Sequence, residues 1–95
     1  MSASIHPRPA VLDLFAGAGG LGLGLTRAGF RVQAANEYES VFAATYALNH
    51  PETTVVAGDV LDPAIRAELL AAAQGVDVVA GGPPCQGFST VGKKN

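Results

Sequence analysis

The sequence contains one cysteine, Cys85, and no tryptophan among its 95 residues. A single cysteine excludes an internal disulfide, so a reducing compartment is the simpler expectation. The two histidines, His6 and His50, are far apart in the sequence and have no cysteine partners at metal-ligand spacing. We therefore expect neither a disulfide nor a bound metal in this chain.

The sequence also lacks an excess of positive charge and any long apolar run. Six Lys and Arg residues stand against eight Asp and Glu residues, which gives a net charge of −2. If nucleic acid is a partner, the positively charged surface that binds its phosphates must lie mostly elsewhere. No stretch approaches the roughly 18 apolar residues of a membrane span, and the opening residues lack a signal-peptide core. We expect a cytoplasmic protein with no membrane partner.

The sequence does have a strongly apolar composition with a regular pattern. Hydrophobic residues make up 48% of the chain and charged residues 15%, which excludes a disordered chain. After a flexible N-terminal arm at 1–9, apolar and β-branched runs predict strands at 10–15, 31–36, 53–57 and 76–81. Helical spacing with glycine or proline at the ends predicts helices at 21–28, 39–48 and 63–74.

The alternation of strand and helix with short links is typical of an open parallel sheet with right-handed crossovers. We predict an α/β fold, Rossmann-like, with strand order 3-2-1-4, and a single partial domain over residues 10–95. Such a sheet normally continues beyond its fourth strand. We therefore expect a fragment of a longer chain or one half of a two-chain enzyme.

A glycine-rich segment directly follows the first predicted strand. Residues 17–22, GAGGLG, match the pattern G-x-G-x-x-G, in which glycines allow a tight turn and close approach of a ligand to the backbone. Glu37 ends the second strand, 20 residues after Gly17, where an acidic side chain can accept hydrogen bonds from ribose hydroxyls. On these features NAD and S-adenosylmethionine fit comparably, and a purely structural turn is the alternative.

Two further acidic residues lie in or after predicted strands. Asp59 follows the third strand, where its carboxylate can accept a hydrogen bond from an adenine amino group. Phe15 and Val60 would give apolar contacts to the ring, and the alternative for Asp59 is a capping or loop carboxylate. Asp13 lies within the first strand, and we expect it to brace the amides of the glycine loop rather than to touch ligand.

Cys85 follows the fourth predicted strand. In the order 3-2-1-4 the first and fourth strands are neighbours, so the glycine loop and the cysteine loop meet at the topological switch point. Pro83 and Pro84 stiffen the approach to Cys85, and a thiolate held beside a cofactor suits covalent catalysis. The alternative for this cysteine is a small buried hydrophobic residue.

Four motifs, in order, resemble those of the DNA cytosine-C5 methyltransferase family. Residues 13–20, DLFAGAGG, are similar to the first motif of that family, and residues 82–89, GPPCQGFS, are similar to its catalytic motif. Residues 36–37, NE, and 58–60, GDV, are similar to the two motifs between them. The set covers residues 11–92, and the resemblance implies S-adenosylmethionine as the cofactor.

The resemblance also implies roles for individual residues. Cys85 would be the nucleophile, and Gln86 and Ser89 would face the DNA. The cofactor would be held by Phe15, Ala16, Gly17, Gly19, Gly20, Glu37, Tyr38, Asp59 and Val60. Phe15 would lie against adenine and Glu37 would hold the ribose, while Tyr38 matches a position where the family often has a bulky aromatic on the cofactor.

The mechanism implied by the resemblance begins when the target cytosine is flipped out of the DNA duplex. The Cys85 thiolate would add to C6, C5 would take the methyl group from S-adenosylmethionine, and loss of the C5 proton would release the enzyme. The sequence lacks the family's later Glu-Asn-Val motif, whose glutamate assists the addition, as well as its arginine-bearing motif and target-recognition region. Because a positioned acid contributes ~10²–10⁴-fold, we expect the chain to be inactive unless a second chain or segment completes it.

Three other functions stay open on the sequence. A tRNA cytosine-C5 methyltransferase has similar motifs, although the Gln-Gly-Phe-Ser ending favours DNA. An NAD-dependent oxidoreductase fits the glycine loop but not the Pro-Pro-Cys run. A non-catalytic module would keep only the cofactor half. The DNA interpretation implies a restriction-modification methyltransferase that works at the prokaryotic nucleoid.

Overall fold

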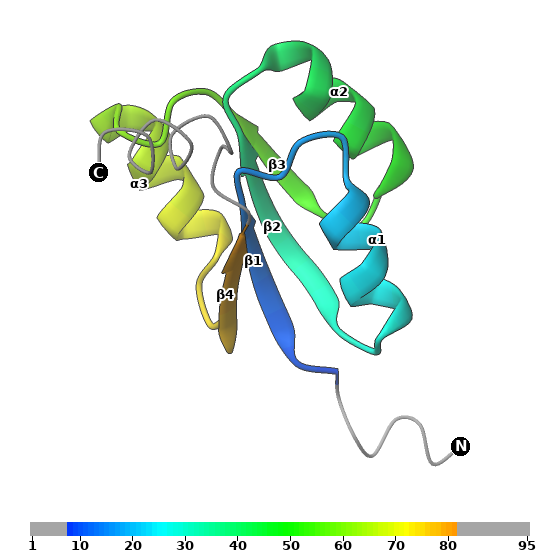
Figure 1. The fold of residues 1–95 in the computed structure, drawn as a ribbon. Helices are drawn as coiled ribbons and strands as arrows, with labels where there is room; N and C mark the ends of the chain where they lie inside the picture. The colour runs from blue at the N-terminus through cyan, green and yellow to red at the C-terminus, as the bar shows by residue number, and fades with distance from the viewer. Residues whose placement is uncertain (1–7, 82–95) are drawn as a thin grey trace, which may run out of the picture.

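The computed structural model describes residues 8–81, in which strands and helices alternate (Figure 1). The strands are β1 (Ala10–Leu14), β2 (Arg31–Glu37), β3 (Thr54–Ala57) and β4 (Val78–Gly81). The helices are α1 (Gly20–Arg27), α2 (Ser40–Asn49) and α3 (Pro63–Ala72). The strands are parallel in the order β3-β2-β1-β4, which confirms the predicted α/β fold and strand order.

The helices form a layer on each side of the sheet. Helices α1 and α2 cover one face, and α3 covers the other (Figure 1). Helix α3 begins as predicted, with the Asp62 carboxylate accepting a hydrogen bond from the Ala64 N–H and Pro63 in the first turn. Helix α1 ends before Gly29, whose φ of 101° is the left-handed conformation common after helices.

Strand β2 contains one extra residue relative to β1. The register between the two strands shifts so that Gln33 has no partner in β1. This bulge lets Val32 and Ala34 pack on opposite faces of the sheet, although they are two residues apart. The Gln33 amide donates hydrogen bonds to the carbonyls of Ala72 and Gln74 at the end of α3, at 3.0 and 2.8 Å. The bulge therefore ties β2 to α3.

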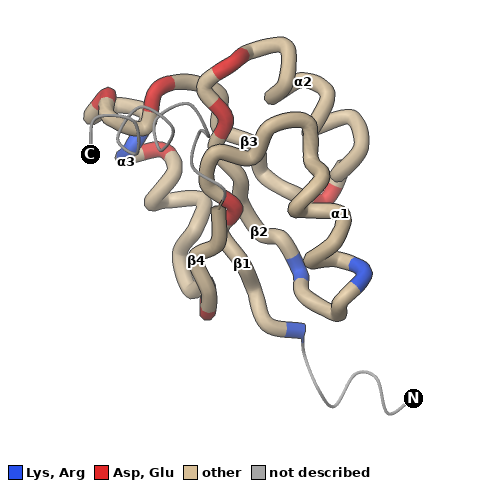
Figure 2. The backbone as a smooth tube through the Cα atoms, in the orientation of Figure 1, with Lys and Arg blue, Asp and Glu red and all other residues tan. Residues whose placement is uncertain are grey.

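Acidic residues are more numerous at the carboxyl ends of the strands, and arginines at the amino ends (Figure 2). The last residue of β2 and the segments after β2 and β3 carry the acidic residues Glu37, Glu39, Asp59 and Asp62. Arginines lie at the opposite end, at Arg8, Arg27 and Arg31. The carboxyl ends of β2 and β3 therefore carry negative charge, on the edge where parallel sheets bind ligands.

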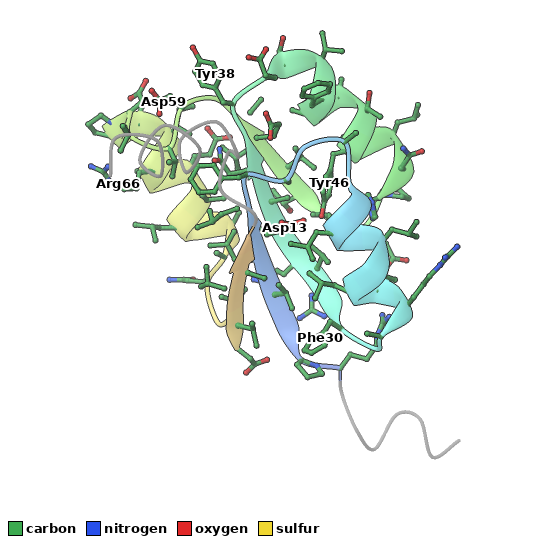
Figure 3. All side chains as sticks on the ribbon, in the orientation of Figure 1. Asp13, Phe30, Tyr38, Tyr46, Asp59 and Arg66 are labelled. Carbon is green, nitrogen blue, oxygen red and sulfur yellow. The ribbon has the colours of Figure 1, made fainter. Side chains whose placement is uncertain are left out.

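The face covered by α1 and α2 combines apolar and polar burial. Its buried apolar cluster consists of Ala16, Val32, Ala35 and Tyr46. Figure 3 shows the Tyr46 side chain directed from α2 toward Asp13 in β1. Both of these side chains are completely buried. A carboxylate thus lies inside this half of the core.

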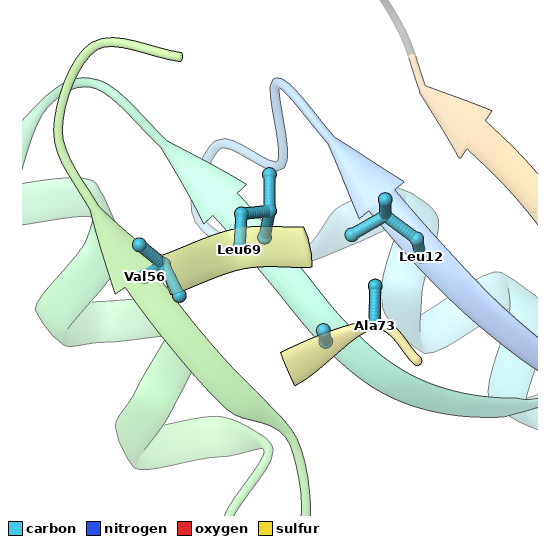
Figure 4. Packing of buried hydrophobic residues seen from close by; sticks show 5 residues of the cluster. Leu12, Val56, Leu69 and Ala73 are labelled. Carbon is cyan, nitrogen blue, oxygen red and sulfur yellow. The ribbon is translucent and has the colours of Figure 1, made fainter. Parts of the chain in front are cut away.

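The face covered by α3 buries mainly apolar side chains. Its buried cluster consists of Leu12, Ala34, Val56, Leu69 and Ala73, part of which is drawn in Figure 4. In this cluster, side chains of β1, β2 and β3 pack against Leu69 of α3 and against Ala73, the residue after the helix. Burial of apolar area of this kind is the main source of folding stability, at about 25 cal/mol per Å².

Candidate functional site

The loop after β1 has an unusual backbone. Phe15, Gly17 and Gly19 have positive φ values of 53°, 59° and 112°. This conformation is ordinary for glycine but uncommon for Phe15, and such strain concentrates at ligand sites. The Phe15 side chain is 42% exposed, and a Cβ at Gly17 or Gly20 would meet no heavy atom within 4 Å. The loop therefore offers an open, glycine-lined surface with an aromatic ring beside it.

The end of β2 holds this loop in place. The Ala16 N–H donates to the Asn36 carbonyl at 2.9 Å. The Gly17 N–H donates to Oε1 of Glu37 at 2.7 Å, and the Glu39 N–H donates to Oε2 of Glu37 at 2.8 Å. Glu37 therefore lies where the sequence predicted it, at the carboxyl edge, and it also binds the glycine loop.

Asp13 does not brace the glycine-loop amides, so that expectation was wrong. Its side chain points into the layer between the sheet and α1 and α2, where Oδ2 accepts a hydrogen bond from the Tyr46 hydroxyl at 2.9 Å (Figure 3). Oδ1 has no hydrogen-bond partner among residues 8–81. Burial raises the pKa of Asp13 above its ordinary value of 3.8, although the Tyr46 hydrogen bond and the charge of His50 act to lower it.

Tyr46 packs beneath the glycine-rich segment. A Cβ at Gly22 would overlap the Tyr46 hydroxyl, and a Cβ at Gly19 would lie 2.7 Å from Nε2 of His50. The Tyr46 and His50 rings are 4.4 Å apart between centroids. Burial and the Asp13 carboxylate raise the pKa of the Tyr46 phenol.

The apolar spacing of residues 39–48 indicated Tyr46 only as part of a helix and did not reveal this hydrogen bond. A signal was available, since a carboxylate in the middle of an apolar strand needs a buried donor. Tyr46 carries such a donor on the helix that follows β2.

Asp59 lies in the loop after β3, at the predicted edge. Its Oδ1 accepts a hydrogen bond from the Leu61 N–H at 2.9 Å, which is the loop role that the sequence left as the alternative. The predicted contact between Asp59 and adenine stays a prediction. The Asn36 amide, whose contacts were not predicted, donates to the carbonyls of Val56 and Gly58 at 3.1 and 3.0 Å. It thereby fixes the end of β3 beside the end of β2.

Tyr38 and Val60 complete the predicted cofactor residues at this edge. The Tyr38 side chain is 66% exposed, and Figure 3 shows it at the same end of the molecule as Asp59. Val60 is partly buried against the apolar cluster beneath α3. The fold thus brings the loops after β1, β2 and β3 to one edge of the sheet.

The remaining predicted residues, Cys85, Gln86 and Ser89, lie outside the described residues. Strand β4, which precedes them in sequence, pairs with β1, and Gly81 at its end is opposite Leu14. A Cβ at Gly81 would lie 2.5 Å from the Leu14 carbonyl oxygen, so the two strands approach closely at this edge. The predicted neighbourhood of the first and fourth strands is confirmed.

A cavity of about 390 Å³ lies behind the glycine loop, between α1 and the end of α2. It is lined by Ala18, Gly19, Gly20, Leu23, Asn49 and His50. Another cavity, of about 230 Å³, lies toward the amino ends of the strands, and its lining residues include Arg8, Arg31 and Thr53. That second cavity contains none of the predicted cofactor residues.

Within residues 8–81, no His, Asp and Glu side chains gather in a group of three that could hold a metal ion. The same part of the chain has no helix with the length and apolar character needed to cross a membrane.

The described residues fit an adenosine-bearing cofactor. A carboxylate has about four acceptor positions on its two oxygens, so Glu37 can accept from ribose hydroxyls in addition to the two backbone amides. The exposed Phe15 ring offers an apolar surface for adenine, and the open glycines allow the rest of a cofactor to pass close to the backbone. S-adenosylmethionine has the matching groups.

Comparison with known proteins places the chain more narrowly. The family model for C-5 cytosine-specific DNA methylase matches residues 10–95. The Type II methyltransferase M.AgeI of Thalassovita gelatinovora is 50% identical over 86 residues, covering 87% of this chain and 20% of that protein. The Type II methyltransferase M.NgoPII of Neisseria gonorrhoeae is 43% identical over 82 residues, covering 86% of this chain and 23% of that protein. The chain thus spans about a fifth of the length of these relatives.

A solved structure agrees with these sequence matches. A crystal structure from E. coli, named as a prophage-encoded DNA modification methyltransferase, superimposes with a TM-score of 0.70 and 41% identity. The match covers 84% of this chain and 24% of that one. The methyl donor implied for C-5 cytosine-specific DNA methylases is S-adenosylmethionine, which the residues above fit. With the family model matching nearly the whole sequence, the chain belongs to the C-5 cytosine-specific DNA methylase family.

Proposed function

We propose that this chain supplies the cofactor site and the nucleophile for methylation of cytosine C5 in DNA. The observation that carries the proposal is the pairing of β4 with β1, which brings the end of β4 beside the start of the glycine loop. Cys85 follows β4 by four residues in the sequence, and the family match extends across it. This strand order supports a common pocket for cofactor and thiol.

In this proposal, different residues at the carboxyl edge of the sheet bind different parts of the cofactor. Glu37 accepts hydrogen bonds from the ribose hydroxyls, Phe15 lies against adenine, and Asp59 accepts from the adenine amino group through Oδ2. The other contacts come from Ala16, Gly17, Gly19, Gly20, Tyr38 and Val60. When bound, S-adenosylmethionine supplies an electrophilic methyl group on a sulfonium. The exposed Phe15 ring and the open glycines support this division.

The chemical role of the chain itself rests with Cys85. Its thiolate forms a bond to C6 of the target cytosine, and the electron pair of the C5–C6 double bond moves toward C5, which becomes nucleophilic. After C5 carries its methyl group, the C5 proton leaves to a base, the C5–C6 double bond re-forms, and the S–C6 bond breaks. The thiolate is thereby regenerated.

Recognition of DNA requires groups beyond the described edge. The acidic residues after β2 and β3 give that edge a negative charge, which does not attract phosphates (Figure 2). We assign Gln86 and Ser89 to the surroundings of a cytosine flipped out of the duplex. Further segments, in the same polypeptide or in a second chain, supply the acid that assists addition and the surface that selects the target sequence. The substrate is then the DNA of a prokaryotic nucleoid.

A chimera tests the nucleophile. Residues 10–95 replace the matching segment of M.AgeI, and transfer of a radiolabelled methyl group to DNA is measured. We expect the chimera to transfer methyl groups and its Cys85→Ser variant to lose on the order of 10³-fold or more, because serine is a far weaker nucleophile. A Leu48→Gln chimera is the control, since Leu48 is 81% exposed on α2. A Cys85→Ser chimera as active as this control would refute the assignment.

Cofactor choice is tested on the full chain. Isothermal titration with S-adenosylmethionine and, separately, with NAD compares the two cofactors that fit the glycine loop. We expect binding of the former only. Tighter binding of NAD would contradict the proposal, because it would make the site that of an oxidoreductase.

A further inference from the structure

Glu37 has contacts that a simple ribose-binding carboxylate does not need. The residue ends β2, and only 8% of its surface is exposed. Oε1 accepts from the Gly17 N–H at 2.7 Å and Oε2 accepts from the Glu39 N–H at 2.8 Å. One donor belongs to the glycine loop after β1, and the other belongs to the residue that caps α2. A single side chain therefore joins the loop to the start of a helix.

These two hydrogen bonds are of a strong type. Both use an ionised acceptor, and such bonds are shorter and roughly twice as strong as neutral ones. The carboxylate also lies near the N-terminus of α2, where the helix dipole favours negative charge. The Ala16 N–H is held by the Asn36 carbonyl, so two successive amides of the loop are fixed to the end of β2.

The position of Gly17 makes its hydrogen bond consequential. Its φ of 59° directs the chain into the glycine-rich turn, and a Cβ at this residue would meet no heavy atom within 4 Å. The Cβ side of Gly17 is therefore open, and the hydrogen bond to Glu37 restrains the loop directly at this residue.

We infer that Glu37 is a positioning residue for the glycine loop as well as a ribose acceptor. Its carboxylate sets the loop and the start of α2 in their binding geometry before any cofactor arrives. Of its roughly four acceptor positions, two serve backbone amides and two are left for the vicinal hydroxyls of a ribose. Cofactor binding then adds to the clamp without breaking it. The ribose half of this statement rests on the proposed function, whereas the clamp does not.

The substitution Glu37→Gln distinguishes the role of Glu37 in the clamp from its role as a ribose acceptor. A ribose hydroxyl can donate or accept, so a glutamine amide can still bind the diol. A backbone N–H can only donate, and the NH₂ group of glutamine would face either Gly17 or Glu39 without an acceptor. Glu37→Gln therefore breaks one arm of the clamp even if it keeps the ribose contact.

The experiment measures amide hydrogen exchange by NMR in the full chain without cofactor. We expect protection of the Gly17 or Glu39 amide to fall about tenfold or more in Glu37→Gln, since a hydrogen bond to a charged group is lost. Glu37→Asp keeps the charge but is one methylene shorter and cannot span both amides, so it should lose protection as well. Glu52→Gln, the same change at an exposed position before β3, is the matched control. Titration of each variant with S-adenosylmethionine should show Kd rising about tenfold for Glu37→Gln and for Glu37→Asp, and unchanged for Glu52→Gln.

Two results would overturn the inference. One is full protection of both amides in Glu37→Gln together with weakened cofactor binding, which would leave Glu37 as a ribose acceptor alone. The other needs no variant: a Gly17 amide in the wild-type chain that exchanges as fast as an unstructured one would exclude the clamp. If the wild type did not bind S-adenosylmethionine, the proposed function would fail, but the exchange results would still decide on the clamp.

Discussion

The face of the sheet beneath α3 and the face beneath α1 and α2 bury different groups. Under α3, Leu12, Val56 and Leu69 belong to one cluster of buried apolar side chains (Figure 4). Under α1 and α2, Asp13 and Tyr46 are both completely buried and share a hydrogen bond of 2.9 Å. Only the second face supports the glycine-rich segment, because Gly22 lies directly against this pair.

This difference determines which substitutions each face of the sheet should tolerate. Apolar packing accepts side chains of similar volume in more than one arrangement, at a modest cost. A buried hydrogen bond fixes the distance and direction between its partners, and it leaves a costly unpaired group when one of them is removed. We therefore expect the α3 face to respond to volume and the α1 and α2 face to respond to geometry.

The largest effect on stability is expected on the α3 face. Leu69→Ala removes most of a side chain that is 3% exposed and should lower the free energy of unfolding by about 2–5 kcal/mol. Leu69→Met, which nearly conserves volume, should lower it by less than about 1.5 kcal/mol. Urea denaturation of the full chain measures both. Equal losses in the two variants would mean that this face depends on shape as strictly as the other.

Tyr46→Phe should have the next largest effect. The change removes only the hydroxyl that donates to Asp13, so the volume of the core is nearly unchanged. A hydrogen bond to a charged group contributes about 1.5–3 kcal/mol, and the free energy of unfolding should fall by about that amount. Val56→Thr, an isosteric change on the α3 face, is the comparison in which a polar group is gained. A Tyr46→Phe variant as stable as the wild type would show that the hydrogen bond adds nothing.

Two glycines of α1 sharpen the contrast further. A Cβ at Gly22 would overlap the Tyr46 hydroxyl, whereas a Cβ at Gly24 would meet no heavy atom within 4 Å. Gly22→Ala should destabilise the chain by about 1–3 kcal/mol through overpacking. Gly24→Ala should stabilise it by about 0.5–1 kcal/mol, because alanine is the better helix former. Thermal and urea unfolding measure the sign of the stability change in each variant. If the two variants changed stability alike, the close contact between Gly22 and the Tyr46 hydroxyl would be contradicted.

A double variant tests whether the hydroxyl is the obstacle. If Gly22→Ala is harmful because of the Tyr46 hydroxyl, its effect should be smaller in a chain that already carries Tyr46→Phe. Residues in contact normally couple by ~0.5–3 kcal/mol. If the two changes in the free energy of unfolding were strictly additive, the strain in Gly22→Ala would not come from the Tyr46 hydroxyl.

Local patterns were sufficient to predict the framework. Apolar runs and helical spacing located the strands and helices, and the observed ends differ from the predicted ones by a residue or two. The βαβ rhythm indicated a Rossmann-like sheet, and the strand order predicted for such a sheet is confirmed. The same rhythm placed Glu37 and Asp59 at one edge, because the carboxyl ends of parallel strands lie together.

Contacts that depend on register and on side-chain direction could not be predicted in this way. The sequence assigned the bracing of the glycine loop to Asp13, but Glu37 reaches the Gly17 amide from the neighbouring strand. Helix α2 is apolar on several sides, so its spacing did not reveal that Tyr46 is buried while Leu48 is exposed. The bulge at Gln33 also leaves no periodic signal, because it interrupts the pattern that would show it.

The smallest effect is a dependence on pH that should belong to the α1 and α2 face alone. Burial raises the pKa of Asp13 in the folded chain above its ordinary value of 3.8. Between the ordinary and the raised pKa the folded chain binds more protons at this residue than the unfolded chain does. The contribution of Asp13 to stability is therefore highest at low pH and declines as the pH rises through the raised value.

Asp13→Asn isolates this contribution, because asparagine cannot titrate. The free energy of unfolding of the variant, taken relative to the wild type, should rise as the pH increases from about 4 and level off above the raised pKa. Urea denaturation at a series of pH values measures that difference, and the titration of all other groups largely cancels in it. A difference that stayed flat with pH would mean that Asp13 titrates alike in the folded and unfolded chains. Oδ1 of Asp13, which has no partner within the described part of the chain, would then have to be solvated or partnered, and the two faces of the sheet would be more alike than their contacts indicate.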